Sequence, residues 1–181
     1  MRPPRPNAYR DTWAGEVGTA REGEHVRVAG WVHRRRDHGG LIFIDLRERS
    51  GLLQLVFHPE SAPEAFALAE RLRPEHVISA VGTVVRREEG TVNPRLATGE
   101  VELAVEGLER LAESATPPFP IDDEGPVDEV LRLRHRVLDL RREGMRDAMG
   151  LRHTVVRAMR DHLGSNDFLE IETPILTRST P

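Results

Sequence analysis

Cysteine and lysine are both absent from this 181-residue chain, and each absence narrows what it can do. Without cysteine, disulfides and thiolate metal sites are excluded. The eight histidines show none of the paired spacings of a zinc site, so we expect no metal site in this segment. All 26 basic residues are arginine, which we attribute to genomic composition bias rather than to function.

Long apolar runs are also missing. No stretch is long enough to cross a bilayer, and the start carries no signal-peptide pattern, which predicts a cytoplasmic protein without a membrane partner. A hydrophobic content of 38% against 31% charged residues indicates a globular chain with room for one or two domains. The net charge of −4 argues against a nucleic-acid binder held by bulk electrostatics. Any RNA binding must therefore be local.

Aromatic residues make up only 4% of the chain, and Phe43 lies in its most informative stretch, residues 31–47. This stretch carries an arginine cluster, Arg34–Arg36, turns at Gly39-Gly40 and continues in a predicted strand. Alternation along that strand separates an apolar row from a second row that contains Phe43. The apolar row consists of Ile42, Ile44 and Leu46.

Two interpretations of this stretch are open. A phenylalanine beside an arginine turn can stack an unpaired base while the arginines hold its phosphates. The alternative is a partly buried sheet aromatic next to a solvated charge run, which composition alone favours. The surrounding chain shifts the balance towards base binding.

Five strands and one helix are predicted before residue 112. The strands begin at His25 and continue as Leu41–Arg47, Leu52–Phe57, His76–Arg87 and Glu100–Leu111. A capping box at Ser61–Glu64 predicts a helix that runs to Leu72, and Gly30 suggests a bulge or bend in the first strand. Three strands, one helix and two strands is the order of the five-stranded OB-fold, the oligonucleotide-binding barrel, so the predicted fold is mainly β.

The binding face of such a barrel is formed by its second and third strands and their flanking loops. Phe43 and Gln54 fall on these two strands, both on the side away from the aliphatic row. The open face therefore combines a stacking ring and an amide with an arginine cluster, which together make a coherent RNA-binding site.

The chain divides into three predicted parts. Residues 1–115 form the barrel and residues 116–130, rich in proline and acids, form a linker. Residues 131–181 contain a basic amphipathic segment, a helix ended by Gly164-Ser165, and a strand over Phe168–Leu176. Because a helix and a strand alone cannot bury both faces of a sheet, we expect this last part to be a truncated α+β domain.

Four segments together resemble bacterial aspartyl-tRNA synthetase, a class IIb enzyme, over essentially the whole chain. The segments are residues 31–47, Asn93–Glu100, Val137–Arg142 and Phe168–Thr177. The resemblance implies the amino-terminal part of that enzyme: the anticodon-binding barrel, the hinge and the first class II motif.

The resemblance also implies roles for individual residues in the barrel. Phe43 would stack on the middle anticodon base, a uridine, and Gln54 would hydrogen-bond its edge. Glu102 would accept from the donors of the first base, guanine, which suits a carboxylate. Arg34 and Arg36 would lie along the anticodon loop.

The first class II motif matches Phe168–Thr177. The resemblance implies that this motif, with Pro174, builds a homodimer interface. The chain departs from the family pattern by Asp167, where glycine is usual, and aspartate tolerates the left-handed backbone better than most residues.

Two further positions bear on tRNA choice. His38 and Gly90 stand where discriminating enzymes have leucine and often lysine, so the chain resembles the non-discriminating branch, which charges both tRNA-Asp and tRNA-Asn with aspartate. Both positions are expected at the rim of the binding face, near the third anticodon base. The alternative is that they are two variable loop residues without a role.

The reaction implied for the parent enzyme joins L-aspartate to tRNA through an aspartyl-adenylate, with ATP and Mg²⁺. In the family, the residues that carry out this reaction lie beyond residue 181, so we assign no catalytic residue. We expect this chain to bind RNA without aminoacylating it. Two alternatives stay open: a sister lysyl- or asparaginyl-tRNA synthetase, and a stand-alone OB-fold RNA-binding module.

Overall fold

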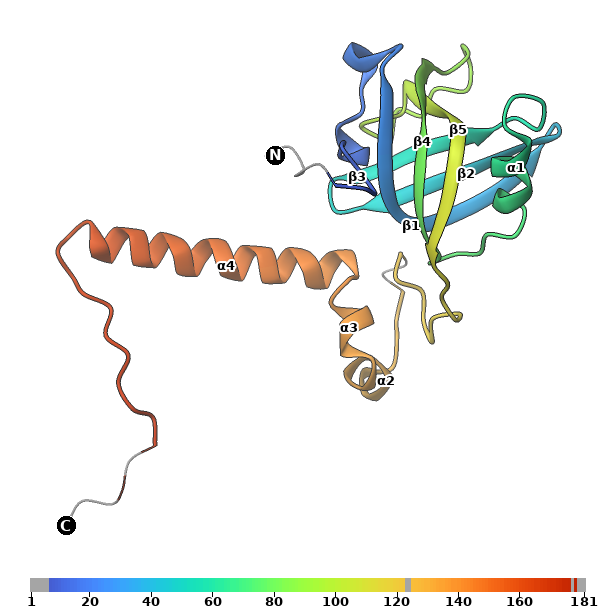
Figure 1. The fold of residues 1–181 in the computed structure, drawn as a ribbon. Coiled ribbons are helices and arrows are strands. Elements are labelled where there is room, and N and C mark those ends of the chain that lie inside the picture. The colour runs from blue at the N-terminus through green and yellow to red at the C-terminus, as the bar shows by residue number, and fades with distance from the viewer. Residues whose placement is uncertain (1–6, 123–124, 177, 179–181) are drawn as a thin grey trace. The chain divides into compact units, whose positions relative to one another are not determined.

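The computed structural model describes residues 7–122, 125–176 and 178, which belong to two compact units, residues 1–116 and 117–181. The first unit is a closed barrel of five strands in the order β1-β2-β3-β5-β4, with one short helix (Figure 1). Its elements are β1 (His25–His38), β2 (Leu41–Glu48), β3 (Gly51–Phe57), α1 (Pro63–Ala69), β4 (Val77–Arg86) and β5 (Val101–Ala112). Two 3-10 turns, Ala14–Glu16 and Thr19–Arg21, precede β1. The predicted OB-fold is confirmed.

Alternating burial along β1, β2 and β5 builds much of the barrel core, whereas β3 is buried on both of its rows from Leu53 to Phe57. Ile44 and Leu46 on β2 and Leu53 and Leu55 on β3 are fully buried, as is Val28 on β1. Antiparallel pairs join β1 to β2 and to β4, β2 to β3, and β4 to β5, whereas β3 and β5 pair in parallel and close the barrel. In β1, β2 and β5 one row is thus used for packing, and the other row is left for the outer surface.

The arginine cluster lies in a strand, not in a turn as predicted. β1 continues through Arg34–Arg36 to His38 and pairs with β2 along this length. The turn itself is at Gly39-Gly40, where both residues have positive φ, as a two-residue hairpin of type I′ requires. The arginines therefore project from a rigid hairpin.

The irregularity in β1 falls between Val32 and Arg34 rather than at Gly30. At this point the backbone of Val32 leaves β4 and exchanges hydrogen bonds with Glu75 and His76 (2.7 and 2.8 Å). Gly30 serves close approach instead: a Cβ there would lie 2.5 Å from the carbonyl oxygen of Arg47. The predicted bulge position was wrong because the glycine signal reflects tight packing between strands.

The capping box at Ser61–Glu64 is not formed. Ala62 is the N-cap of α1 and makes no side-chain cap hydrogen bond, with Pro63 at the first position. The helix ends at Ala69, earlier than the predicted Leu72, and continues as tighter turns in which Leu72 donates to Ala69. Proline at the first helical position starts the helix without the cap.

The second unit is helical in its described part. It contains α2 (Glu129–Arg134), α3 (Arg136–Asp139) and α4 (Glu143–Gly164). The fully buried carboxylate of Asp139 accepts from Arg132 (2.8 Å) and Arg136 (2.6 Å). The hydrogen bond and charge of Arg132, with the charge of Arg136, lower the pKa of Asp139. This ion cluster joins α2 to α3.

The strand predicted over residues 168–176 is wrong for the described residues, which are extended without strand pairing; residue 177 lies outside them. A strand needs a neighbour to satisfy its backbone groups, and the described part of the chain supplies none here. Asp167 has a positive φ of 65°, as its position in place of glycine predicts. Across the described ranges, no helix is long and apolar enough to cross a membrane.

Candidate nucleic-acid interface

An open pocket of about 740 Å³ lies on the outer face of the barrel. It brings together five of the predicted site residues, from β1, β2 and β3. These are Arg34, Arg36, His38, Phe43 and Gln54. The loop between β4 and β5 closes the other side with Thr91, Asn93, Arg95 and Leu96.

Phe43 belongs to the row of β2 that points away from the core. Its neighbours Ile42 and Ile44 are buried, whereas the ring of Phe43 remains partly exposed in the pocket. In the sheet it lies opposite Arg36 on β1 and Val56 on β3. An aromatic ring is therefore presented on a rigid strand next to a guanidinium group.

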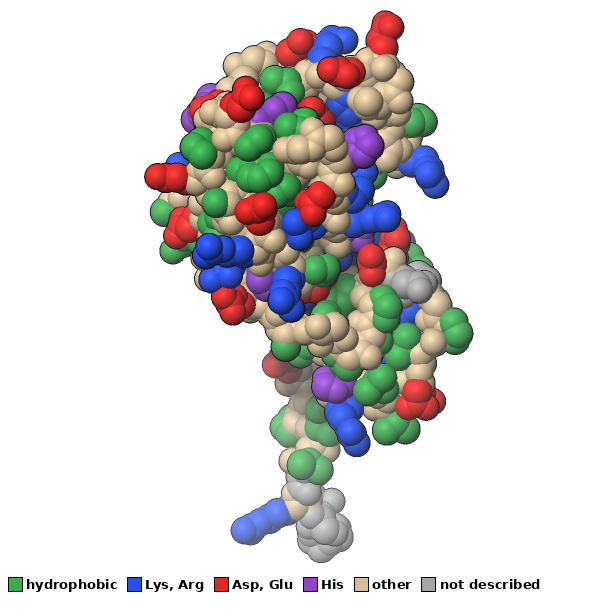
Figure 2. Space-filling model, turned by 90° about the vertical axis from the view of Figure 1, so that its right-hand side faces the viewer, with side chains coloured by type: hydrophobic (Ala, Val, Ile, Leu, Met, Phe, Trp, Pro, Cys, Tyr) green, Lys and Arg blue, Asp and Glu red, His purple; other side chains and the backbone are tan. Residues whose placement is uncertain are grey.

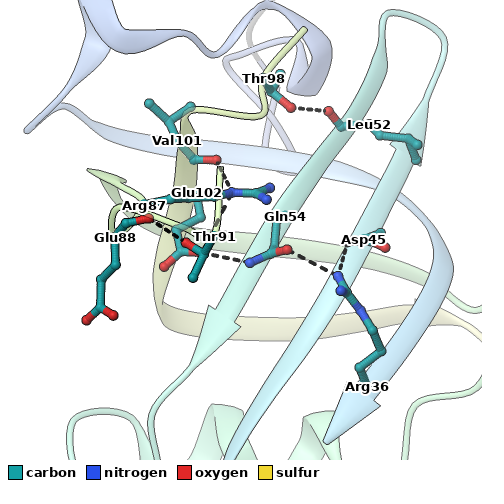
Figure 3. Close-up of polar contacts among 10 residues, drawn as sticks. All are labelled: Arg36, Asp45, Leu52, Gln54, Arg87, Glu88, Thr91, Thr98, Val101 and Glu102. Carbon is teal, nitrogen blue, oxygen red and sulfur yellow. Dashed lines mark hydrogen bonds and ion pairs between the residues drawn. The ribbon is translucent and has the colours of Figure 1, made fainter. Parts of the chain in front are cut away.

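A chain of polar contacts crosses the pocket floor (Figure 3). Arg36 donates from one nitrogen to Asp45 (2.8 Å) and to the amide oxygen of Gln54 (3.1 Å). The amide nitrogen of Gln54 donates to Glu102 on β5 (2.7 Å). Because one end of the amide accepts and the other donates, both contacts fix the orientation of Gln54.

Glu102 therefore lies in the same site as Gln54. Its side chain is 18% exposed, and the Nε of Arg87 is 4.0 Å from its carboxylate. The carboxylate can accept further hydrogen bonds beyond the one from Gln54. Of the predicted anticodon-binding residues, all five share one surface.

Arg87 is a site residue that the sequence analysis missed. Its side chain is only 3% exposed, and Nε donates to the carbonyl oxygen of Val101 (3.0 Å). Burial lowers the pKa of Arg87, while the charges of Glu102 and Asp45 act in the opposite direction. Alternation along β4 supplies a signal that could have found it, because Val84 faces the core and Arg87 falls on the opposite row.

The loop of residues 88–99 is folded on itself and forms a wall of the pocket. The backbone N–H of Asn93 donates to the oxygen of Gly99 (3.0 Å), that of Leu96 to Asn93 (3.1 Å), and that of Gly99 to Leu96 (3.0 Å). A Cβ on Gly99 would lie 1.8 Å from the oxygen of Asn93. Thr98 donates to the carbonyl oxygen of Leu52 on β3 (2.6 Å). The wall is thus attached to the barrel, and its lining residues escaped prediction because only tertiary contacts bring the loop to the site.

His38 and Gly90 lie at different places on the rim. His38 is exposed at the end of β1 and lines the pocket. Gly90 is exposed in the loop with φ +93°, has open space around it, and precedes the lining residue Thr91. Pro174 belongs to the second unit, where it is exposed, and is not among the residues that line the pocket.

The surface charge is mixed. Basic and acidic side chains are intermixed over the face shown in Figure 2, and the net charge of the chain is −4. Attraction for a polyanion therefore depends on the arginines at the pocket rather than on a broad basic surface.

Two family models match the chain. Residues 26–111 match the OB-fold nucleic acid binding domain, and residues 128–181 match the tRNA synthetases class II (D, K and N). The matched ranges cover the barrel and the helical unit respectively.

Curated relatives with high identity include two ligases. The aspartate–tRNA(Asp/Asn) ligase of Rubrobacter xylanophilus is 57% identical over 175 residues, covering 97% of this chain and 29% of the relative. That of Bacillus subtilis is 52% identical over 173 residues, covering 95% and 29%. The chain thus spans somewhat less than a third of the length of the relatives it matches.

Solved structures share the fold. An asparaginyl-tRNA synthetase from Pyrococcus horikoshii with asparaginyl-adenylate superposes with a TM-score of 0.75 at 29% identity, over 91% of this chain and 36% of that chain. An aspartyl-tRNA synthetase from Entamoeba histolytica gives 0.79 at 21% identity, over 92% and 40%. Sequence and fold agree: the chain belongs to the aspartate–tRNA ligase family of class II aminoacyl-tRNA synthetases.

Proposed function

We propose that this chain is the anticodon-binding part of an aspartate–tRNA(Asp/Asn) ligase, which attaches L-aspartate to tRNA at the expense of ATP. Residues 1–115 are the anticodon-binding domain, residues 116–130 the linker, and residues 131–181 the hinge and the beginning of the catalytic domain. The identity of 57% and 52% to ligases of this name supports the assignment.

The observation that carries the proposal is the partly exposed ring of Phe43 beside Arg34 and Arg36 in one pocket. Every base has a face that can stack on an aromatic ring, and arginine pairs with phosphate. An unpaired loop offers both groups at once, whereas a regular duplex hides its base faces. The middle anticodon base is the one proposed to stack on Phe43.

Base identity is read by Gln54 and Glu102. The oriented amide of Gln54 faces the edge of the middle uridine, and the carboxylate of Glu102 accepts from the two adjacent N–H groups of guanine at the first position. A site that hydrogen-bonds such donors rejects a base that lacks them, because the buried acceptor is then left unpaired.

The adenylation chemistry belongs to the longer protein. Across the described ranges, no group of three or more histidine, aspartate or glutamate side chains could hold a metal ion. We propose that the steps that need ATP and Mg²⁺ are carried out by the rest of that protein, since this chain spans 29% of the ligases it matches. The longer protein is proposed to act as a cytoplasmic homodimer, with the segment around Pro174 at the dimer interface.

Acceptance of both tRNAs is proposed to depend on His38 and Gly90. The two anticodons differ only in the third base, C for aspartate and U for asparagine. Gly90 leaves open space at the rim, and His38 can either donate or accept a hydrogen bond. Such a rim can accommodate either pyrimidine.

Binding to two anticodon stem-loops that are identical except for a final C or U tests the proposal. We expect similar dissociation constants for both loops at a stated salt concentration. Phe43→Ala is expected to weaken both by about 1–3 kcal/mol, the range of one base–aromatic stack. Absence of binding to either loop would contradict the anticodon-binding function.

A sister specificity is the second candidate, because the Pyrococcus asparaginyl enzyme shares the fold at 29% identity. An asparaginyl enzyme needs the U-ending loop alone. A strong preference for that loop would favour this candidate, and a preference for the C-ending loop would keep the aspartate assignment while removing the proposed dual acceptance.

A further inference from the structure

The polar chain in the pocket floor continues beyond the residues that face the RNA. It begins at Asp45 on β2, passes through Arg36 on β1 and Gln54 on β3 to Glu102 on β5, and ends at Arg87, directly after β4 (Figure 3). Four strands, β1, β2, β3 and β5, thus contribute one member each, and β4 ends one residue before Arg87. Two arginines and two carboxylates balance in charge around one neutral amide.

Arg87 is the most buried of the four charged members. Its side chain is 3% exposed, against 45% for Arg36 and 18% for Glu102. Its Nη2 atom is buried and has no hydrogen-bond partner among the described residues. A buried charge without full pairing costs stability, so its retention in the pocket calls for a contribution other than packing.

The carboxylate that accepts from the Gln54 amide nitrogen is also one that lies close to Arg87. Glu102 uses Oε2 for both: 2.7 Å to Gln54 and 4.0 Å to the Nε of Arg87. A guanidinium close to a carboxylate restrains its position by charge attraction. The carboxylate of Glu102 has two oxygens, so it can accept from Gln54 and from a base simultaneously.

We propose that Arg87 is a positioning residue that acts through Glu102: it keeps this carboxylate aligned, and through the Glu102–Gln54 hydrogen bond it couples recognition of the first anticodon base to recognition of the second. The inference rests on the anticodon-binding function proposed above. It assigns to Arg87 no direct contact with RNA.

The test measures the preference of the 181-residue chain for guanine over adenine at the first anticodon position. Adenine lacks the two adjacent N–H donors that a carboxylate reads. We expect Arg87→Met to reduce the preference for guanine about tenfold, the scale of one lost base contact. Arg86→Met is the matched control: it removes the same charge, but from an exposed arginine that pairs with Glu22. This replacement is expected to leave the preference unchanged.

A double-mutant cycle separates positioning from direct contact. If Arg87 acts through Glu102, Arg87→Met changes the guanine preference less than about twofold in the Glu102→Gln background. If the two losses multiply, Arg87 contacts the RNA by itself and the proposal is wrong. A parallel cycle with Gln54→Ala and uridine against cytidine at the second position is expected to show the same non-additivity.

Two further results are distinguished. Failure of the unmodified chain to bind any stem-loop overturns the anticodon-binding function, and the positioning role with it. A guanine preference that survives Arg87→Met overturns the positioning role alone. If circular dichroism shows that Arg87→Met does not fold, the cycle is run with Arg87→Lys, which keeps the charge and is expected to retain part of the preference, again without additivity with Glu102→Gln.

Discussion

At the scale of single residues, the pocket is defined by which row of each strand a side chain occupies. Phe43 and Gln54 fall on outward rows, and the residues beside them in sequence, Ile44 and Leu55, fill the core. A change at an inward position alters the stability of the barrel, whereas a change at an outward position alters the pocket. The rim residues His38 and Gly90 are proposed to add selectivity.

Replacement of both rim residues tests their role. His38→Leu combined with Gly90→Lys is expected to make the chain prefer the C-ending stem-loop over the U-ending one by roughly tenfold, the scale of one mismatched base. The measurement is the ratio of the two dissociation constants. Lysine at φ +93° also strains the loop, so Gly23→Lys, at φ +79° in open space, serves as the control for backbone strain. An unchanged ratio would leave these positions without a role in selectivity.

At the scale of elements, two preformed units create the site. The β1–β2 hairpin presents the arginines from a strand, and the loop of residues 88–99 is closed by its own hydrogen bonds and attached to β3 through Thr98. Neither unit needs to fold on binding, which lowers the entropic cost of association.

The loop is sensitive to one added methyl group. In Gly99→Ala the new Cβ would overlap the carbonyl oxygen of Asn93, so residues 93–99 must shift and the pocket wall with them. We expect a loss of about 1–3 kcal/mol in stability and weaker stem-loop binding, measured by thermal unfolding and by titration. Gly18→Ala, where nothing lies within 4 Å, is expected to change neither. Unaltered RNA binding by Gly99→Ala would show that the wall takes no part.

At the scale of the whole molecule, the positive charge that matters for binding is the group of arginines at the pocket. The chain carries a net charge of −4, yet arginines gather at the pocket. Arg35 and Arg36 are engaged by Asp37 and Asp45, whereas Arg34 is exposed. Within the described residues Arg34 makes no ion pair, so it can meet a phosphate without first breaking one, and the exposed Arg95 in the pocket wall can do the same.

Salt dependence reports this directly. The logarithm of the association constant for a stem-loop is expected to fall linearly with the logarithm of the salt concentration. The slope is about 0.7 for each phosphate contacted on a single strand, which makes it shallow. Arg34→Met is expected to lower the slope by about 0.7, and Arg73→Met, outside the pocket lining, to leave it unchanged. A slope that does not differ between Arg34→Met and the unmodified chain would place the phosphates elsewhere.

The sequence by itself determined the strand order, the inward rows and the presence of Phe43 and Gln54 on one face, because alternation and turn residues are local properties of the chain. Only the tertiary structure decided that Arg34–Arg36 lie in a strand, that Glu102 bonds Gln54, and that Arg87 is the buried arginine of its pair. These depend on barrel closure, which brings β1, β3 and β5 together across long sequence separations. The last strand failed because a strand forms only when a neighbour satisfies its backbone groups. The capping box failed for a local reason, because the N-cap is Ala62 rather than Ser61 and Pro63 starts the helix.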